Sequence, residues 1–148
     1  MKKFALFVFA LILLGAPGVP QPEAQDGSGY RVVVNSANPV RDLTKTQVSN
    51  FLLKKKGKWD HGVDVAPADL DSQSAVRAAM SDDIHGRSVA AIKNFWQRQI
   101  FSGRDVPPPE LPDDTKMLDH VRSHPGAIGY VSASAKVDGV KVLTVRPD

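Results

Sequence analysis

The chain has 148 residues, of which 24% are charged and 42% hydrophobic, and it contains no cysteine. A chain of this length forms one domain and buries well over half of its unfolded surface without cross-links. The lack of cysteine excludes disulfides and a cysteine-linked lipid anchor. Removing Lys2, Lys3 and Glu23 from the 19 basic and 16 acidic residues leaves 17 and 15. A protein this close to neutral, with no basic face apparent in its sequence, is not expected to bind nucleic acid.

Residues 1–24 have the pattern of an export signal. A basic start, Met1-Lys2-Lys3, precedes the apolar run "FALFVFALILLG", and small, turn-prone residues follow. The run is shorter than the roughly 20 residues that span a bilayer, so it predicts a cleaved secretory signal peptide rather than a membrane anchor. Cleavage is expected after Gly18 or Ala24. The mature, periplasmic domain would then cover residues 25–148.

The first half of the domain reads as strand, helix, strand. The run "YRVVVNSANP" predicts a central strand. Thr44 and Gln47 form a capping-box pattern that opens a helix over residues 44–56, which Gly57 would close. The basic stretch "KKKGKW" is typical of a helix C-terminus, with contact to an anionic partner as the alternative. After it, "VDVAPADL" predicts a short strand.

Helices and strands alternate in the second half as well. A helix is expected to open after Asp71, Ser72 or Ser74, and another over residues 88–101, with Trp96 in the core. A fourth helix, residues 115–123, would be capped by Asp113 or Asp114. The segment "HPGAIGYVS" predicts a buried strand whose glycines mark a close approach by backbone or ligand. Finally, "VDGV" predicts a hairpin turn into a last strand, "VKVLTV".

The sequence does not assemble a catalytic or metal site. His120 and His124 are four residues apart, but no Glu stands in the register of a zinc-protease helix. No serine lies in a G-x-S-x-G elbow. We therefore expect a non-enzymatic protein without a metal or cofactor.

The loop "DLDSQSAVR" is the best candidate for binding. If it precedes a helix, its backbone N–H groups and the hydroxyls of Ser72 and Ser74 converge at the positive end of the helix dipole. Such a place suits a small oxyanion. The alternative is that these serines only cap the helix.

Three stretches together carry a family resemblance. They are "VVVNSANPVRDLTKTQVSNFLLKKKGKW", "VAPADLDSQSAVR" and "HPGAIGYVS", followed by "VKVLTV". In this order they resemble the substrate-binding protein of the phosphate ABC importer, a type 2 periplasmic-binding protein, over most of the chain from Tyr30 to Val145. The resemblance implies an α/β fold: a three-layer single lobe, with a mixed sheet and flanking helices, like the short stand-alone members. In such a lobe the glycines of "AIGYV" serve close packing.

The resemblance also implies a ligand site. The family's phosphate loop has serine, glycine and threonine at a helix start and an arginine four residues earlier. Ser74 matches the serine, whereas Ala75, Val76 and Leu70 replace the glycine, threonine and arginine. The expected ligand-binding residues are Ser72, Ser74, Ala75 and Arg77, which would bind phosphate or another small anion weakly.

Two functions follow from this resemblance. The first is a binding protein for phosphate or a similar oxyanion, which works with an ABC permease or another envelope protein. The second is an envelope interaction module that kept the fold and lost the ligand site. Such a module would dock through "KKKGKW" or through the proline-rich segment "GRDVPPPELPDD".

Overall fold

A four-stranded mixed sheet forms the centre of the protein. The computed structural model describes residues 29–148, so the predicted signal peptide lies outside the described residues. The strand order is β3-β6-β1-β7. Strand β1 pairs antiparallel with both β6 and β7, and β3 pairs parallel with β6. The strands are β1 (Tyr30–Asn35), β3 (Ala66–Pro67), β6 (Ala127–Ser132) and β7 (Val140–Val142).

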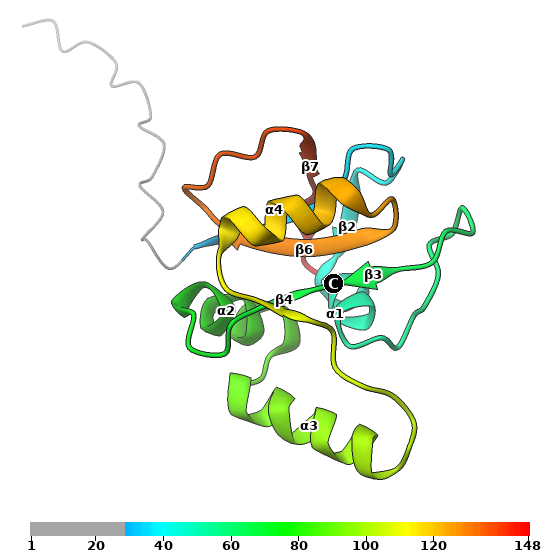
Figure 1. Ribbon diagram of the computed structural model, residues 1–148, viewed down its shortest axis with the longest axis vertical. Helices are drawn as coiled ribbons and strands as arrows, with labels where there is room; N and C mark the ends of the chain where they lie inside the picture. The colour runs from blue at the N-terminus through cyan, green and yellow to red at the C-terminus, as the bar shows by residue number, and fades with distance from the viewer. Residues whose placement is uncertain (1–28) are drawn as a thin grey trace, which may run out of the picture.

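Helices cover both faces of this sheet, as the sequence predicted (Figure 1). Helix α4 lies on one face, and α1 and α2 pack on the other; α2 continues into the π-helical turn η1. Helix α3 lies further from the sheet than the others. The bounds are α1 (Lys45–Leu52), α2 (Ala75–Met80), η1 (Ser81–His85), α3 (Val89–Phe101) and α4 (Asp114–Ser123).

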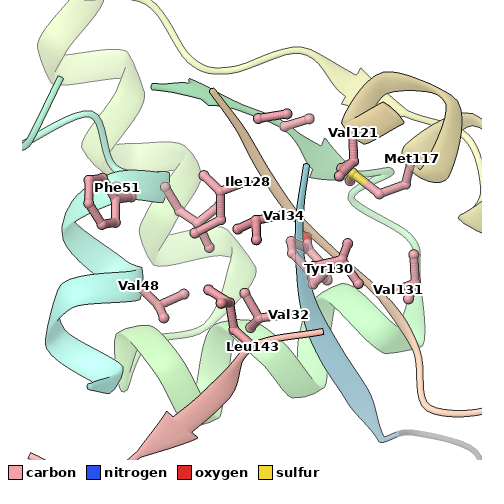
Figure 2. Close-up of a cluster of buried hydrophobic side chains, with 14 of the residues drawn as sticks. Val32, Val34, Val48, Phe51, Met117, Val121, Ile128, Tyr130, Val131 and Leu143 are labelled. Atoms are coloured by element: carbon pink, nitrogen blue, oxygen red, sulfur yellow. The ribbon is translucent and has the colours of Figure 1, made fainter. Parts of the chain in front are cut away.

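Successive side chains of β1 and β6 point to opposite faces of the sheet, and both faces are covered by helices. Val32 and Val34 of β1 lie opposite Tyr130 and Ile128 of β6, and these residues share the face that packs on α1 (Figure 2). The intervening residues, such as Val131, face α4. Because both faces are buried, the central strands are almost continuously apolar rather than alternating.

Gly129 in β6 and Gly126 just before it allow close packing, as expected. A Cβ on Gly129 would stand 2.4 Å from the sulfur of Met117, so α4 rests directly on this part of β6. A Cβ on Gly126 would stand 1.7 Å from the backbone oxygen of Asp64. Both positions therefore admit a helix or a backbone rather than a ligand.

Two short parallel pairs complete the structure and correct two predictions. Strand β2 (Asp42–Thr44) pairs with β8 (Thr144–Arg146), and β4 (Asp69–Leu70) pairs with β5 (Glu110–Leu111). The predicted single strand "VKVLTV" is thus divided between β7 and β8, which belong to different sheets. The predicted hairpin was also wrong, because β1 lies between β6 and β7.

The first helix is shorter than predicted. It opens with the predicted Thr44–Gln47 capping box but ends at Leu52, and Lys54, with φ +56°, takes the left-handed conformation expected for Gly57. The following lysines are engaged locally: the Nζ of Lys56 lies 2.6 Å from Asp60, and that of Lys55 lies 5.9 Å from the Phe95 ring centroid. This basic stretch therefore makes local contacts and does not simply project into solvent.

The caps predicted for α2 and α4 are present, and α3 is capped in the same way. Ser74, Ser88 and Asp113 cap α2, α3 and α4 by accepting a hydrogen bond from a first-turn N–H group. Trp96 is buried as predicted, although it belongs to a separate small cluster with Leu53, Ile92 and Phe95. Within residues 29–148, no helix has the length and apolar character to cross a membrane.

Candidate functional site

The predicted binding loop lies between β4 and α2. Its backbone is held by an Asx turn, in which Asp71 Oδ1 accepts from Gln73 N at 2.8 Å and Asp71 O accepts from Ser74 N at 2.9 Å. The chain then enters α2 at Ala75. This local geometry follows from Asp and Ser side chains, which compete well for backbone N–H groups before a helix.

The start of α2 presents several hydrogen-bond donors to solvent. Ser74 Oγ accepts from Arg77 N at 3.3 Å, so this hydroxyl caps the helix. Within the described residues, no protein acceptor satisfies the N–H groups of Ala75 and Val76 or the hydroxyl of Ser72. Ala75 is exposed and both serines are half-buried. These donors can bind a small anion or water.

Arg77 is placed differently from the other three predicted residues. Its side chain is buried, with 4% of its surface exposed. It donates to Leu70 O at 2.9 Å and to Glu110 Oε1 at 2.7 Å, and its Nη2 lies 3.6 Å from Asp69 Oδ2. The structure thus brings Ser72, Ser74 and Ala75 together, whereas the charged group of Arg77 pairs with carboxylates.

Asp69 is the centre of a buried polar network that sequence reasoning missed. Tyr130 donates its hydroxyl hydrogen to Asp69 Oδ1 at 2.5 Å and accepts from Leu70 N at 3.1 Å. Burial raises the pKa of Asp69, and the charge of Arg77 and the hydrogen bond from Tyr130 only partly oppose this. Desolvation lowers the pKa of Arg77, but Asp69 and Glu110 more than reverse that effect. The available signal was an acidic residue inside an apolar strand segment, eight positions before an arginine.

Leu70 belongs to the core rather than to the loop surface. Its side chain is 2% exposed and packs in the main hydrophobic cluster. The position at which the resemblance implies an arginine therefore points inward here. An arginine at this position would have to bury its charge or rearrange the loop.

A pocket of about 310 Å³ adjoins the buried network. Asp69, Arg77 and Glu110 border it on one side, and Trp96 and Ile100 of α3 on another. Lys93, Gln97, Pro107 and Pro108 also line it. Phe101 and Val106, which follow Ile100 and precede Pro107 in the chain, are 94% and 59% exposed. The sequence indicated the proline-rich segment but not this apolar surface.

The histidine pair does not form a metal centre with other side chains. The rings of His120 and His124 stack at 4.3 Å between centroids, and His120 Nε2 lies 3.2 Å from Ala66 O. Across residues 29–148 there is no group of three or more His, Asp or Glu side chains arranged to hold a metal ion.

Comparison with solved structures defines the class of fold. The chain has the fold of part of the substrate-binding proteins of phosphate ABC transporters, which confirms the fold that the resemblance implied. No protein-family model matches the chain, and no curated protein matches it.

Three solved structures illustrate the match. An ABC-type phosphate transport receptor from Vibrio cholerae has a TM-score of 0.63 and 19% identity, over 79% of this chain and 46% of the receptor chain. A phosphate ABC transporter substrate-binding protein with bound phosphate from Clostridium perfringens has a TM-score of 0.62 and 21% identity, over 79% of this chain and 44% of that protein. PstS from Borrelia burgdorferi has a TM-score of 0.55 and 13% identity, over 79% of this chain and 47% of that protein. The chain therefore spans less than half the length of these proteins, and at such identities the likeness establishes the fold.

Proposed function

We propose that this chain is an exported, non-enzymatic binding lobe that takes phosphate or a similar small oxyanion weakly at the start of α2. The main support is the set of unsatisfied donors at that point, the N–H groups of Ala75 and Val76 and the hydroxyl of Ser72. They occur in a fold shared with a protein whose structure contains phosphate.

Three features make the proposed binding weak. The charge of Arg77 is engaged by Asp69 and Glu110, so it does not pair fully with a ligand. Asp71 places a carboxylate in the loop itself. A few partly solvated hydrogen bonds of about 0.5–1.5 kcal/mol each support roughly millimolar to high-micromolar affinity. A second wall from an ABC permease or another envelope protein would strengthen binding by excluding water.

Titration calorimetry with inorganic phosphate tests the site. The wild-type protein should bind in that range, and added salt should weaken the binding. Ser74→Ala should weaken it several-fold, and Val76→Thr should tighten it by adding a hydroxyl at the helix start. The gain from one added hydrogen bond is about 0.5–1.5 kcal/mol.

A matched control separates binding from helix capping. Ser88 caps α3 as Ser74 caps α2, and each accepts one first-turn hydrogen bond. Ser88→Ala should cost about 1 kcal/mol of stability, like Ser74→Ala, yet leave phosphate binding unchanged. If neither the wild type nor Val76→Thr binds at several millimolar phosphate, the proposed anion site does not exist.

Export is a separate part of the proposal and has its own test. The basic start and the twelve-residue apolar run of residues 1–24 support removal of a signal peptide on export. Mass spectrometry of the protein from the cell envelope should find a new N-terminus between Ala16 and Gln25. An N-terminus that still begins with Met1 would contradict this.

One observation favours the interaction-module function as the second candidate. Ile100 and Phe101 at the end of α3 are 52% and 94% exposed, and Val106 in the proline-rich segment is 59% exposed. Exposed apolar side chains gathered in this way are typical of a protein contact surface. This candidate is preferred if phosphate fails to bind while photo-crosslinking from position 101 captures an envelope protein.

A further inference from the structure

A second polar pocket lies at the opposite end of the sheet from the start of α2. It has a volume of about 640 Å³ and lies between the β1–β2 loop and the edge strand β7. Figure 1 shows that this loop and this strand are neighbours. Strand β3 runs parallel to β6 and therefore toward the end of the sheet at which β1 begins. The chain continues from β3 through β4 to the loop before α2. The pocket instead adjoins the end at which β1 finishes. It is lined by Ser36, Pro39, Arg41, Lys141, Val142 and Thr144.

Both charged residues that line this pocket are cations. Neither Arg41 nor Lys141 forms an ion pair with any carboxylate within residues 29–148. Asp42, the acidic residue next to Arg41 in the chain, instead lies 2.6 Å from Arg146. The positive charge of the pocket is therefore not neutralised by the described part of the protein.

Lys141 is held in place although it lacks a counterion. Its ammonium donates to the carbonyl of Asn38, which fixes it over the β1–β2 loop. Desolvation lowers the pKa of Lys141, and the nearby charge of Arg41 lowers it further. An anion bound between the two side chains would oppose both effects.

Further hydrogen-bond donors lie near the two cations. The hydroxyls of Ser36 and Thr144 border the pocket. In the same β1–β2 loop, the Asn38 side chain is 2% exposed, and its Nδ2 has no partner within the described residues. Two cations and two hydroxyls match a dianion better than a monoanion, because each charge gains a charge-assisted bond.

We propose that the pocket between the β1–β2 loop and β7 binds an organic phosphate monoester. Arg41 and Lys141 grip the phosphate, the hydroxyls of Ser36 and Thr144 complete its coordination, and Pro39 and Val142 contact the organic group. The volume is within the range of small-molecule sites, and the two apolar residues leave room for more than inorganic phosphate. This site is separate from the one at the start of α2 and does not depend on it.

Two-dimensional NMR titration of the exported domain with glycerol 3-phosphate tests the proposal. Amide shifts should concentrate in residues 36–41 and 140–144, whereas inorganic phosphate at the α2 site should shift residues 72–76. Arg41→Gln should weaken glycerol 3-phosphate binding at least about fivefold, and Arg41→Gln with Lys141→Gln should abolish it. Lys141→Arg should retain binding because it keeps the charge.

Controls and a second probe determine how the result is interpreted. Arg98→Gln and Lys116→Gln remove the same charges from α3 and α4, at exposed positions outside the pocket, and should leave the affinity unchanged. Vesicles containing phosphatidic acid supply the same phosphate chemistry as a lipid headgroup. Vesicle binding that requires Arg41 and Lys141, without binding of glycerol 3-phosphate, would assign the site to a membrane lipid and support the proposal in that form.

Two results would overturn the proposal. The first is that the wild type binds neither glycerol 3-phosphate nor the vesicles. The second is that the wild type and the soluble double variant bind glycerol 3-phosphate equally, whether or not the double variant also aggregates. Equal binding together with aggregation of the double variant would assign the two cations to protecting the exposed edge of β7 from pairing with another chain.

Discussion

Gly126→Ala is expected to lower the free energy of unfolding by about 4 kcal/mol, more than a typical overpacking change. The added Cβ would stand 1.7 Å from the carbonyl oxygen of Asp64 and 2.9 Å from its carbonyl carbon. Both atoms are backbone, so no side chain can rotate away. The Gly126 carbonyl also accepts from Ala66 N and Trp59 Nε1, each at 2.9 Å, and these bonds oppose movement of the chain.

Urea unfolding followed by Trp fluorescence measures this effect, and other glycines provide the comparison. Gly57→Ala should be nearly neutral, because no atom lies within 4 Å of the new Cβ. Gly129→Ala should be intermediate, since the nearest atom is the sulfur of the flexible Met117 side chain. A Gly126→Ala protein as stable as Gly57→Ala would show that residues 57–66 do not pack against residue 126.

Arg77→Met should destabilise the protein by about 3–5 kcal/mol at pH 7, the cost of leaving a buried charge without its partner. Asp69 is 4% exposed and would keep only the hydrogen bond from Tyr130. The carbonyl of Leu70 would also lose its Arg77 donor. Methionine fills a volume similar to that of arginine, so the loss of stability measures mainly the removal of the positive charge.

The effect of pH distinguishes this cause from a packing defect. Burial raises the pKa of Asp69 in the folded protein, so above the ordinary Asp value of about 4 the folded state binds more protons than the unfolded state. Stability from this group therefore increases as the pH falls toward 4. Without Arg77 the pKa of Asp69 rises further, so the deficit of Arg77→Met should be smaller at pH 5 than at pH 7.

Arg146→Met is the matched control for the ion pair. Arg146 pairs with Asp42 at 2.6 Å, but both side chains are about half exposed. Its removal should cost no more than about 1 kcal/mol, because exposed pairs are weak. An Arg77→Met deficit that is equally small, or that does not change with pH, would contradict the role given to the buried network.

Local signals in the sequence were reliable where one turn of chain decides the structure. The capping box at Thr44 and the cap at Asp113 depend on neighbours three residues away, so they could be predicted from spacing alone. The end of α1 could not be predicted in this way. Lys54 adopts the left-handed conformation after the helix, although Gly57, three residues later, would adopt it more easily. Tertiary contacts of Leu53 and Trp59 outweigh the intrinsic preference of glycine there.

Pairings between distant segments were the part that spacing could not supply. Val140 and Lys141 pair with β1 rather than with the preceding strand, so a turn signal at Asp138 and Gly139 suggested the wrong partner. For the same reason, the helix-start serines of the candidate site were predicted, but the burial of Arg77 between Asp69 and Glu110 was not. The carboxylates that pair with Arg77 are brought together by the pairing of β4 with β5. Local sequence patterns do not predict a pairing between such distant segments.

The pairing of β1 with β6 has a consequence for how the chain folds. The two central strands come from opposite ends of the described sequence, so the sheet cannot form until almost all of the domain is present. Closing so long a loop costs entropy before any central contact forms, which slows folding. A nascent chain that lacks residues 127–132 has no partner for β1. The domain therefore reaches its native sheet only after its synthesis is nearly complete, and until then the apolar residues of β1 remain available to chaperones.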